Sequence, residues 1–534
     1  MNKVVIIFFL FVLNHTLSYA DEFEVGRRIY EEGLLSNGQQ LIGIGANDTP
    51  LIGKEAACSN CHRRSGLGGV EGTVFMPPIS ANFIFNPQVH ALAVTDPSQP
   101  MGITIKNHTY TDSALVNMIR SGVNYKGLTV TKAMPRYSLD DKSMNYTIDY
   151  LRHLSLITSA GVYDEELHFA TVFTPEVDDK TKQVVKDEIE AFVLQHNSNM
   201  STVQRHRRIG FDRLRQINRK WVFHFWELKG EPDTWSIQLD NFYKKNPVFA
   251  LISGVSFQSA DPVHDFCEEN KTPCLLRSEL YNSKPLGYYT MGFYSGMSLD
   301  AGLLISSLKK DIIKKPNRII QIYSSSSVNV KINNNLGEQL KLLNIEDEVL
   351  SLESDNISSI RDKIESLDPN HLLLCWCDLN DIEKLGALNI PKESQVYFSG
   401  SLLLMKSGFK QFQDTWKNAK LLYPFELPDK RIRQLSPFYT WVSGHQFEPI
   451  NEVIQSDTYT SMLVLQEAIS EMVDNLYKDY LIERVENILG MGIEYWGIYS
   501  RPSFGTDQRY ANRSGYITRF ENNKFISDFE RIVE

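Results

Sequence analysis

The most constraining feature of this chain is the pentapeptide Cys58-Ser59-Asn60-Cys61-His62. Two thiols separated by two residues can each add to one vinyl group of a haem, and the adjacent histidine is then held beneath the iron as its proximal ligand. The spacing therefore predicts one covalently attached haem c, bound through thioethers to Cys58 and Cys61, with His62 on the iron.

Three other interpretations of the pentapeptide compete with haem attachment. A zinc site would need a second pair of ligands nearby, but the remaining cysteines lie about 200 residues or more away, at positions 267, 274, 375 and 377. A thioredoxin-like redox pair would follow a strand, whereas Glu55-Ala56-Ala57 indicates a helical approach. Chance is the third interpretation, and an export signal ahead of the motif makes haem the better one.

That export signal occupies residues 1–20. Lys3 gives a positive start, residues 4–13 are an apolar run, and Ser18-Tyr19-Ala20 is the small-x-small pattern that signal peptidase reads. A membrane anchor is the alternative, but a spanning helix needs about 20 apolar residues. We expect cleavage after Ala20, export to the periplasm, and no membrane span in the mature protein.

The sixth iron ligand is predicted to be Met134, which precedes Pro135 and an amphipathic stretch. A thioether is soft and neutral, and it raises the reduction potential relative to a second histidine. Core packing is the commoner role of a methionine. Met76 is a rival ligand, but it lies only 14 residues beyond His62, on the side of the chain expected to hold the proximal histidine.

Together these residues make the segment from about Asp21 to Leu156 resemble a class I c-type cytochrome domain. Three further motifs are similar to that family. Gly26, Ile29 and Tyr30 form a glycine and aromatic pair, and Thr111-Asp112 caps a helix that Ser121-Gly122 ends. The last helix has one apolar stripe, formed by Met144, Ile148, Leu151 and Leu154. The resemblance implies an all-α domain over residues 21–158. It also implies that a proline carbonyl near Pro77 accepts the ring N–H of His62.

From about Leu167 the pattern changes to alternating strands and helices. The strands are almost continuously apolar, which is typical of parallel sheets covered on both faces. We expect strands at 168–173, 221–228, 248–253, 318–323, 371–377 and 395–399, and helices at 179–196, 233–245, 299–313 and 456–477. Residues 165–534 thereby resemble a two-lobed α/β periplasmic-binding-protein-like domain of type I, the branched-chain amino-acid-binding-like group. The resemblance implies a small-molecule ligand in an interlobe cleft.

Ligands of such folds lie at the carboxyl ends of strands, where serine and glycine residues gather in this chain. The candidates are Ser253–Ser256, Ser278, Ser324–Ser327 and Ser399–Ser401. Ordinary turn and cap roles explain the same residues, so the pocket itself stays unidentified. The sequence offers no nucleophile beside a base, and we expect no enzyme activity.

The spacing of the other cysteines predicts whether they form disulfides. Cys267 and Cys274 flank a short helix-to-strand turn, and we expect a disulfide between them. Cys375 and Cys377 stand at i and i+2 on a strand, where bridging geometry is poor, so buried thiols are expected.

The charge balance excludes one class of partner. With 65 acidic against 55 basic residues the net charge is −10, and a nucleic-acid binder would need a basic face. The haem motif and the export signal together predict a periplasmic single-haem electron-transfer protein with a protein redox partner, such as a dehydrogenase. The alternative is a solute-binding or sensor protein of ABC-transporter type, in which haem is a redox reporter or a structural element.

Overall fold

The chain is described from a computed structural model. The structure describes residues 22–534 except 72–73, 87–88, 93–102, 107–108, 157, 207–218, 325–329, 354–355, 387, 389–392, 408–418, 491–496, 506–507, 522–523 and 528. It divides into two compact units: unit 1 comprises Met1–Ser159 and Glu471–Glu483, and unit 2 comprises Ala160–Ser470 and Arg484–Glu534. The predicted signal peptide lies outside the described residues.

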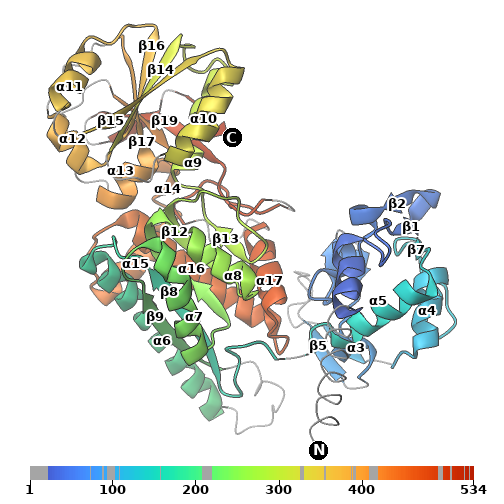
Figure 1. Cartoon of the computed structure of the whole chain (residues 1–534). Helices are drawn as coiled ribbons and strands as arrows, with labels where there is room; N and C mark the ends of the chain where they lie inside the picture. The colour runs from blue at the N-terminus through green and yellow to red at the C-terminus, as the bar shows by residue number, and fades with distance from the viewer. Residues whose placement is uncertain are drawn as a thin grey trace, which may run out of the picture. The chain divides into compact units, whose positions relative to one another are not determined.

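Unit 1 combines short helices with short antiparallel strands (Figure 1). Its helices are residues 22–32, η1 (Ala46–Asp48), η2 (Gly53–Ala56), α2 (Ser59–His62), α3 (Ala81–Ile84), α4 (Asp112–Ser121) and α5 (Asp141–His153). Its strands form a sheet of order β2-β1-β7 and two hairpins, with β1 (Ile42–Ile44), β2 (Pro50–Ile52), β3 (Gly69–Glu71), β4 (Val74–Met76), β5 (Val89–Leu92), β6 (Ile103–Lys106) and β7 (Arg136–Tyr137).

The prediction of an all-α first domain is therefore wrong. Residues 42–52 contain β1 and β2, and Ile42 lies opposite Ile52 in their antiparallel register. Isoleucines at these positions suit a pleated, half-buried surface. Each strand has only three residues, too few for a period of two to stand out in the sequence.

The predicted start and end of α4 are confirmed. The Thr111 hydroxyl accepts a hydrogen bond from the Ala114 N–H at the start of α4, and Gly122 ends that helix with a left-handed φ of 68°. The Asp140 carboxylate caps α5 by accepting from the Ser143 N–H.

The first and last helices of unit 1 pack closely at Gly26. A Cβ at this position would lie 2.4 Å from the Tyr146 carbonyl oxygen and 2.7 Å from the Tyr150 Cβ. The apolar stripe of the last helix faces the same core, because Met144, Ile148 and Leu151 are all buried. Glycine is therefore required for this helix crossing.

Unit 2 contains two sheets, each with its own helices, which we call lobe 1 and lobe 2. Every strand pair in the lobe 1 sheet is parallel, in the order β10-β12-β11-β8-β9 with β13 beside β12. Its elements are β8 (Glu166–Phe173), α6 (Asp179–His206), β9 (Lys220–Glu227), η4 (Pro232–Thr234), α7 (Trp235–Lys245), β10 (Ala250–Ile252), β11 (Val255–Ser259), α8 (Asp261–Glu269), β12 (Cys274–Tyr281) and β13 (Thr290–Gly292).

The lobe 2 sheet is mixed, with the order β15-β14-β16-β17-β18-β19-β20 and β21 beside β19. In Figure 1, α11 and α12 lie on one side of its strands and α10 on the other. Its elements are α9 (Met297–Lys309), β14 (Arg318–Ser324), α10 (Val330–Leu342), β15 (Glu346–Leu352), α11 (Ile357–Glu365), β16 (His371–Trp376), α12 (Leu379–Leu385), β17 (Gln395–Ser399), α13 (Gly400–Ser407), β18 (Lys420–Tyr423), β19 (Ser514–Glu521), β20 (Lys524–Ser527) and β21 (Ile532–Val533). The chain returns antiparallel at β19, which the sequence pattern does not predict.

Three crossovers connect the lobes, because the chain leaves lobe 1 after β13, returns after β18 and leaves again after α17. Between the last two crossovers lie α14 (Pro428–Arg431), α15 (Ser436–His445), α16 (Glu452–Met472) and α17 (Lys478–Gly490). Helix α16 packs on lobe 1, where its Ser461 hydroxyl donates to the Leu276 carbonyl at 2.9 Å. Two lobes joined by several crossovers confirm the predicted two-lobed α/β architecture. Among the described helices, none combines the length and apolar character that crossing a membrane requires.

Replacing Gly26 tests the helix crossing in unit 1. We expect Gly26→Leu to destabilise the protein by about 1–3 kcal/mol, because the new side chain has no space between the two helices. The matched control is Gly69→Ala, where a Cβ meets no atom within 4 Å. Calorimetric melting should show a lower midpoint for the first variant alone, and equal midpoints would contradict the packing described.

Candidate functional site

The Cys58–His62 motif forms the single turn of α2 and the residue before it. The His62 N–H donates to the Cys58 carbonyl at 2.9 Å, and the His62 ring donates from Nδ1 to the Pro77 carbonyl at 2.9 Å. The latter is the hydrogen bond expected from the resemblance. Burial lowers the pKa of His62 although this bond opposes the effect. The ring is thus neutral at neutral pH, with Nε2 as its free nitrogen.

The two thiols of the motif are unbridged and part-exposed. Tyr137 lies within electrostatic reach of both, since burial and then the Cys58 and Cys61 thiols raise its pKa. Met134 is part-exposed and stands three residues before this tyrosine. Met76, the rival ligand, is buried in β4. Two cysteines outside any disulfide, next to an oriented imidazole, are a donor set that fits covalent haem.

In lobe 1, the strand formed by β10 and β11 is interrupted by a bulge at Ser253 and Gly254. The register with β8 shifts by one residue across it, because Ala250 pairs with Phe169 whereas Val255 pairs with Phe173. Gly254 has a φ of 105°, and a Cβ there would lie 2.5 Å from Arg277 Nη1. The bulge therefore makes room for the Arg277 guanidinium within the sheet.

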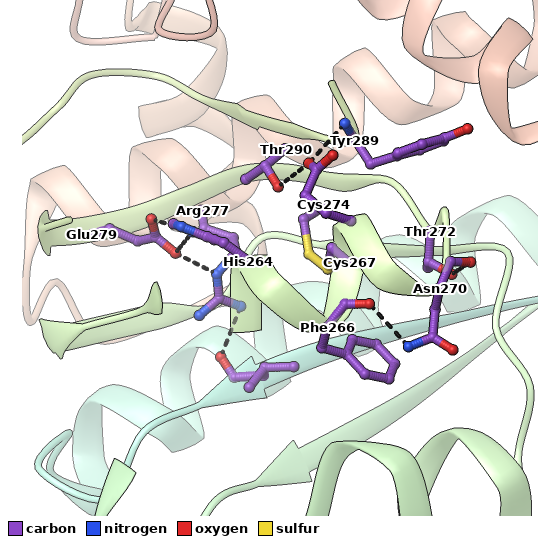
Figure 2. Close-up of a disulfide and its surroundings, with 12 residues drawn as sticks. His264, Phe266, Cys267, Asn270, Thr272, Cys274, Arg277, Glu279, Tyr289 and Thr290 are labelled. Carbon is purple, nitrogen blue, oxygen red and sulfur yellow. Dashed lines mark hydrogen bonds and ion pairs between the residues drawn. A yellow bond between two sulfur atoms is a disulfide. The ribbon is translucent and has the colours of Figure 1, made fainter. Parts of the chain in front are cut away.

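Arg277 belongs to a buried cluster near the carboxyl end of β12, centred on the carboxylate of Glu279 (Figure 2). Arg277 Nε donates to Glu279 Oε1 at 2.7 Å, and His264 Nε2 on α8 lies 2.9 Å from Oε2. Asn282 Nδ2 donates to Oε2 at 3.0 Å. Burial alone would raise the pKa of Glu279, but the charges of His264 and Arg277 outweigh it and hold the pKa well below its usual range.

The Cys267–Cys274 disulfide holds α8 against the start of β12 (Figure 2). Its Cα atoms are 6.1 Å apart. His264 lies one turn before Cys267 on α8, so the cross-link also fixes the imidazole beside Glu279. Cys375 and Cys377 are unbridged and buried.

Three buried polar atoms near this edge of the sheet lack hydrogen-bond partners among the described residues. They are Arg277 Nη2, Asn282 Oδ1 and Glu176 Oε2. The other oxygen of Glu176 accepts from the N–H groups of Phe257 and Gln258 at 2.8 Å, which places this carboxylate at the end of β11. A buried polar group without a hydrogen bond costs about 1–3 kcal/mol of stability. A bound molecule that offers acceptors to the donor atoms and donors to the acceptor atoms would remove that cost.

The serine candidates of the sequence have structural roles in the described residues. Ser253 contacts Thr458, Ser278 donates to Asp457, and both Ser399 and Ser401 donate to Asp300. All four are at most 1% exposed. Ser278 also lies inside β12 rather than after a strand. Ser325–Ser327 lie outside the described residues. Sequence reasoning missed Glu176, Arg277 and Asn282, since nothing in their local sequence indicates that each has a buried polar atom without a partner among the described residues.

Comparisons with known proteins give structural similarity only. No protein-family model matches the chain, and no curated protein matches it. A fatty acid ABC transporter substrate-binding protein from Thermomonospora curvata is 14% identical, with a TM-score of 0.50, covering 71% of this chain and 95% of its own.

Two further solved structures are similar. A leucine-binding protein from Thermotoga maritima is 10% identical, with a TM-score of 0.49 over 68% of this chain and 98% of its own. A branched-chain amino acid transporter substrate-binding protein from Streptococcus pneumoniae, in complex with isoleucine, is 10% identical, with a TM-score of 0.48 over 69% of this chain and 99% of its own.

These findings correct the classification of the whole chain as a metal-binding electron-transfer cytochrome. The similar structure with a TM-score of 0.50 is a substrate-binding protein. Within the described part of the chain, no group of three or more His, Cys, Asp or Glu side chains could hold a metal ion. The expected redox partner has no support either. The pentapeptide at residues 58–62 indicates only the chemistry of its own segment. The structural similarity depends instead on the fold of the larger part of the chain.

The Glu279 cluster predicts a pH-dependent stability difference. Glu279→Gln should destabilise the protein by about 3–5 kcal/mol at pH 7, because it removes the carboxylate that pairs with the buried Arg277 guanidinium and the His264 imidazole. The folded pKa of Glu279 is depressed, so its contribution is present above the unfolded pKa of about 4.3 and is lost as pH falls further. The difference in unfolding free energy between wild type and Glu279→Gln should therefore be smaller at acid pH.

Chemical denaturation at pH 7 and pH 3.5 measures this difference. Glu346→Gln is the control, since Glu346 is exposed in its pair with Arg318 and should change stability by less than about 1 kcal/mol. A Glu279 effect as small as the control's would show that the cluster contributes no net stability.

Proposed function

We propose that unit 2 binds a small solute, as substrate-binding proteins of ABC transporters do, and that the chain is exported to the periplasm and is not an enzyme. The observation that carries the proposal is the set of unpaired polar atoms near the carboxyl edge of lobe 1. Open α/β sheets bind ligands at the carboxyl ends of their strands. The two-lobed fold, shared with a substrate-binding protein, supports the same conclusion.

The unpaired atoms also indicate the character of the solute. Arg277 Nη2 is a donor and matches a carboxylate or carbonyl oxygen, while Asn282 Oδ1 and Glu176 Oε2 are acceptors. The orientation of the Asn282 amide is set by Glu279, because a flipped amide would direct an oxygen at the carboxylate. A polar solute with both an oxygen acceptor and an N–H or O–H donor satisfies all three atoms.

Thermal shift measurements test solute binding. We expect at least one of leucine, isoleucine or a fatty acid, the ligands named for the similar structures, to raise the melting midpoint. At a concentration 100 times Kd the stabilisation is about 2.7 kcal/mol. Arg277→Met and Asn282→Ala should reduce the shift, since each removes one polar contact.

Lys284→Ala serves as the matched control for this experiment. Lys284 is exposed and lies two residues beyond Asn282, and its removal should leave the shift unchanged. If a ligand stabilises wild type and both variants equally, then binding occurs away from the carboxyl edge of lobe 1. If no member of a broad polar and lipid panel shifts the midpoint, the solute-binding proposal fails.

Attachment of one haem c to Cys58 and Cys61, with His62 and Met134 as iron ligands, is a separate proposal that none of the comparisons tests. Its support is the oriented imidazole of His62 and the spacing of Cys58 and Cys61, neither of which is in a disulfide. When bound, such a haem would report redox state or stabilise unit 1. Cys58 and Cys61 would hold it covalently, and the Pro77 carbonyl would fix the tautomer of His62.

Production of the full chain beside a haem maturation apparatus tests this proposal. After acid denaturation the chain should stay coloured, and Cys58→Ala/Cys61→Ala should be colourless. Met134→Leu should keep the covalent haem but lose the weak far-red band of methionine ligation, whereas Met76→Leu should retain that band. A colourless wild-type chain would refute attachment, and loss of the band in Met76→Leu alone would identify Met76 as the ligand.

A further inference from the structure

The three crossovers of unit 2 meet in a cluster of aromatic rings. Tyr294 follows β13 in the first crossover, Phe425 follows β18 in the second, and Tyr499 lies in the third. The Tyr499 ring centroid is 5.5 Å from that of Tyr294 and 5.8 Å from that of Phe425, and it is stacked on Phe293 at 5.2 Å. Rings from the first two crossovers therefore pack on Tyr499, the tyrosine of the third.

A buried carboxyl group, Asp457 on α16, contacts this cluster. Its Oδ2 accepts from the Ser278 hydroxyl of β12 at 2.8 Å and from the Tyr499 hydroxyl at 3.1 Å. Its Oδ1 is buried without a partner among the described residues, and the side chain is 1% exposed. Asp457 thus links the lobe 1 sheet to the third crossover.

The surroundings of Asp457 do not suit a negative charge. No Lys, Arg or His of the described residues is among its hydrogen-bond or ion-pair partners. The titratable groups facing it are the hydroxyls of Tyr499 and Tyr294, and Tyr294 also lies within electrostatic reach of Asp300. A buried carboxylate with one unpaired oxygen is costly in such surroundings. Burial raises the pKa of Asp457 to about 7 despite the two hydrogen bonds.

We propose that Asp457 is a pH-sensitive latch at the junction of the lobes, which keeps the crossovers packed when protonated and loosens them when ionised. Ionisation favours any arrangement in which water reaches the carboxylate. Such an arrangement separates Tyr499 from Asp457 and lets the lobes move apart about the three crossovers. The latch concerns the motion of the lobes and needs no solute.

The direction of the pH effect follows from linkage. A hydrated Asp457 would titrate near 3.8 and the buried one near 7. Between these values the hydrated state holds fewer protons, so rising pH favours it by up to tenfold per pH unit, about a thousandfold in total. The packed arrangement is therefore most favoured at acid pH, and the effect levels off above pH 7.

Energy transfer between two dyes measures the latch in the full chain without solute. Azide-bearing residues at Ile237 on α7 and Leu342 on α10, which are 68% and 83% exposed, place one dye on each lobe. We expect transfer efficiency in the wild type to fall as pH rises from 4.5 to 7 and then to level off. Asp457→Asn, which is isosteric and neutral, should keep the acid-state efficiency throughout.

Two further variants separate the latch from other titrations. Asp300→Asn removes the second buried carboxyl near Tyr294 and should show the same fall in transfer efficiency as the wild type. Tyr499→Phe removes a hydrogen bond that lowers the pKa of Asp457, so the fall should shift to higher pH. A pH-independent wild type, or the same fall in Asp457→Asn, would overturn the proposal. If Asp457→Asn does not fold, an unshifted profile in Tyr499→Phe would overturn it.

Discussion

The buried carboxylate of Glu279 is the interaction on which the carboxyl edge of lobe 1 depends. It lies among a guanidinium, an imidazole and an amide, and each comes from a different position in the chain. A one-residue bulge makes the space for Arg277, and a disulfide fixes the helix that carries His264. Without the carboxylate, the buried Arg277 guanidinium would lose its ion-pair partner in a site with little water.

A comparison between Glu279 and Asp457 shows how neighbours determine the state of a buried acid. Both carboxyls are almost fully buried, so desolvation alone would raise the pKa of each. The His264 imidazole and the Arg277 guanidinium reverse that direction at Glu279, whereas two hydroxyl donors do not at Asp457. The first group is therefore a constant charge that organises a site, and the second can change its charge near neutral pH.

Local sequence patterns predicted those helix ends that depend on residues close together in the chain. The Thr111 cap and the Gly122 stop lie close in sequence to the helix that they bound. The hydrogen bond from His62 to a proline carbonyl was implied by the resemblance to a cytochrome domain. The short strands β1 and β2 were missed because three residues give too little periodicity. For the serine candidates the local sequence does not distinguish the two roles, since a strand-end serine has the same neighbours in sequence whether it faces a ligand or a buried carboxylate.

The sequence by itself determined the cysteine and histidine spacing of residues 58–62, the alternation of strands and helices in unit 2, and the chemistry available at each position. Only the tertiary structure decided which of these groups meet. Glu176 follows β8, whereas Arg277 lies in β12 and Asn282 directly after it, and Asp457 reaches Ser278 across about 180 residues of chain. Hydrophobic periodicity specifies which face of an element is buried, but the pairing of distant polar groups depends on strand register, bulges and crossovers. These are properties of the folded sheet as a whole and leave no local signal.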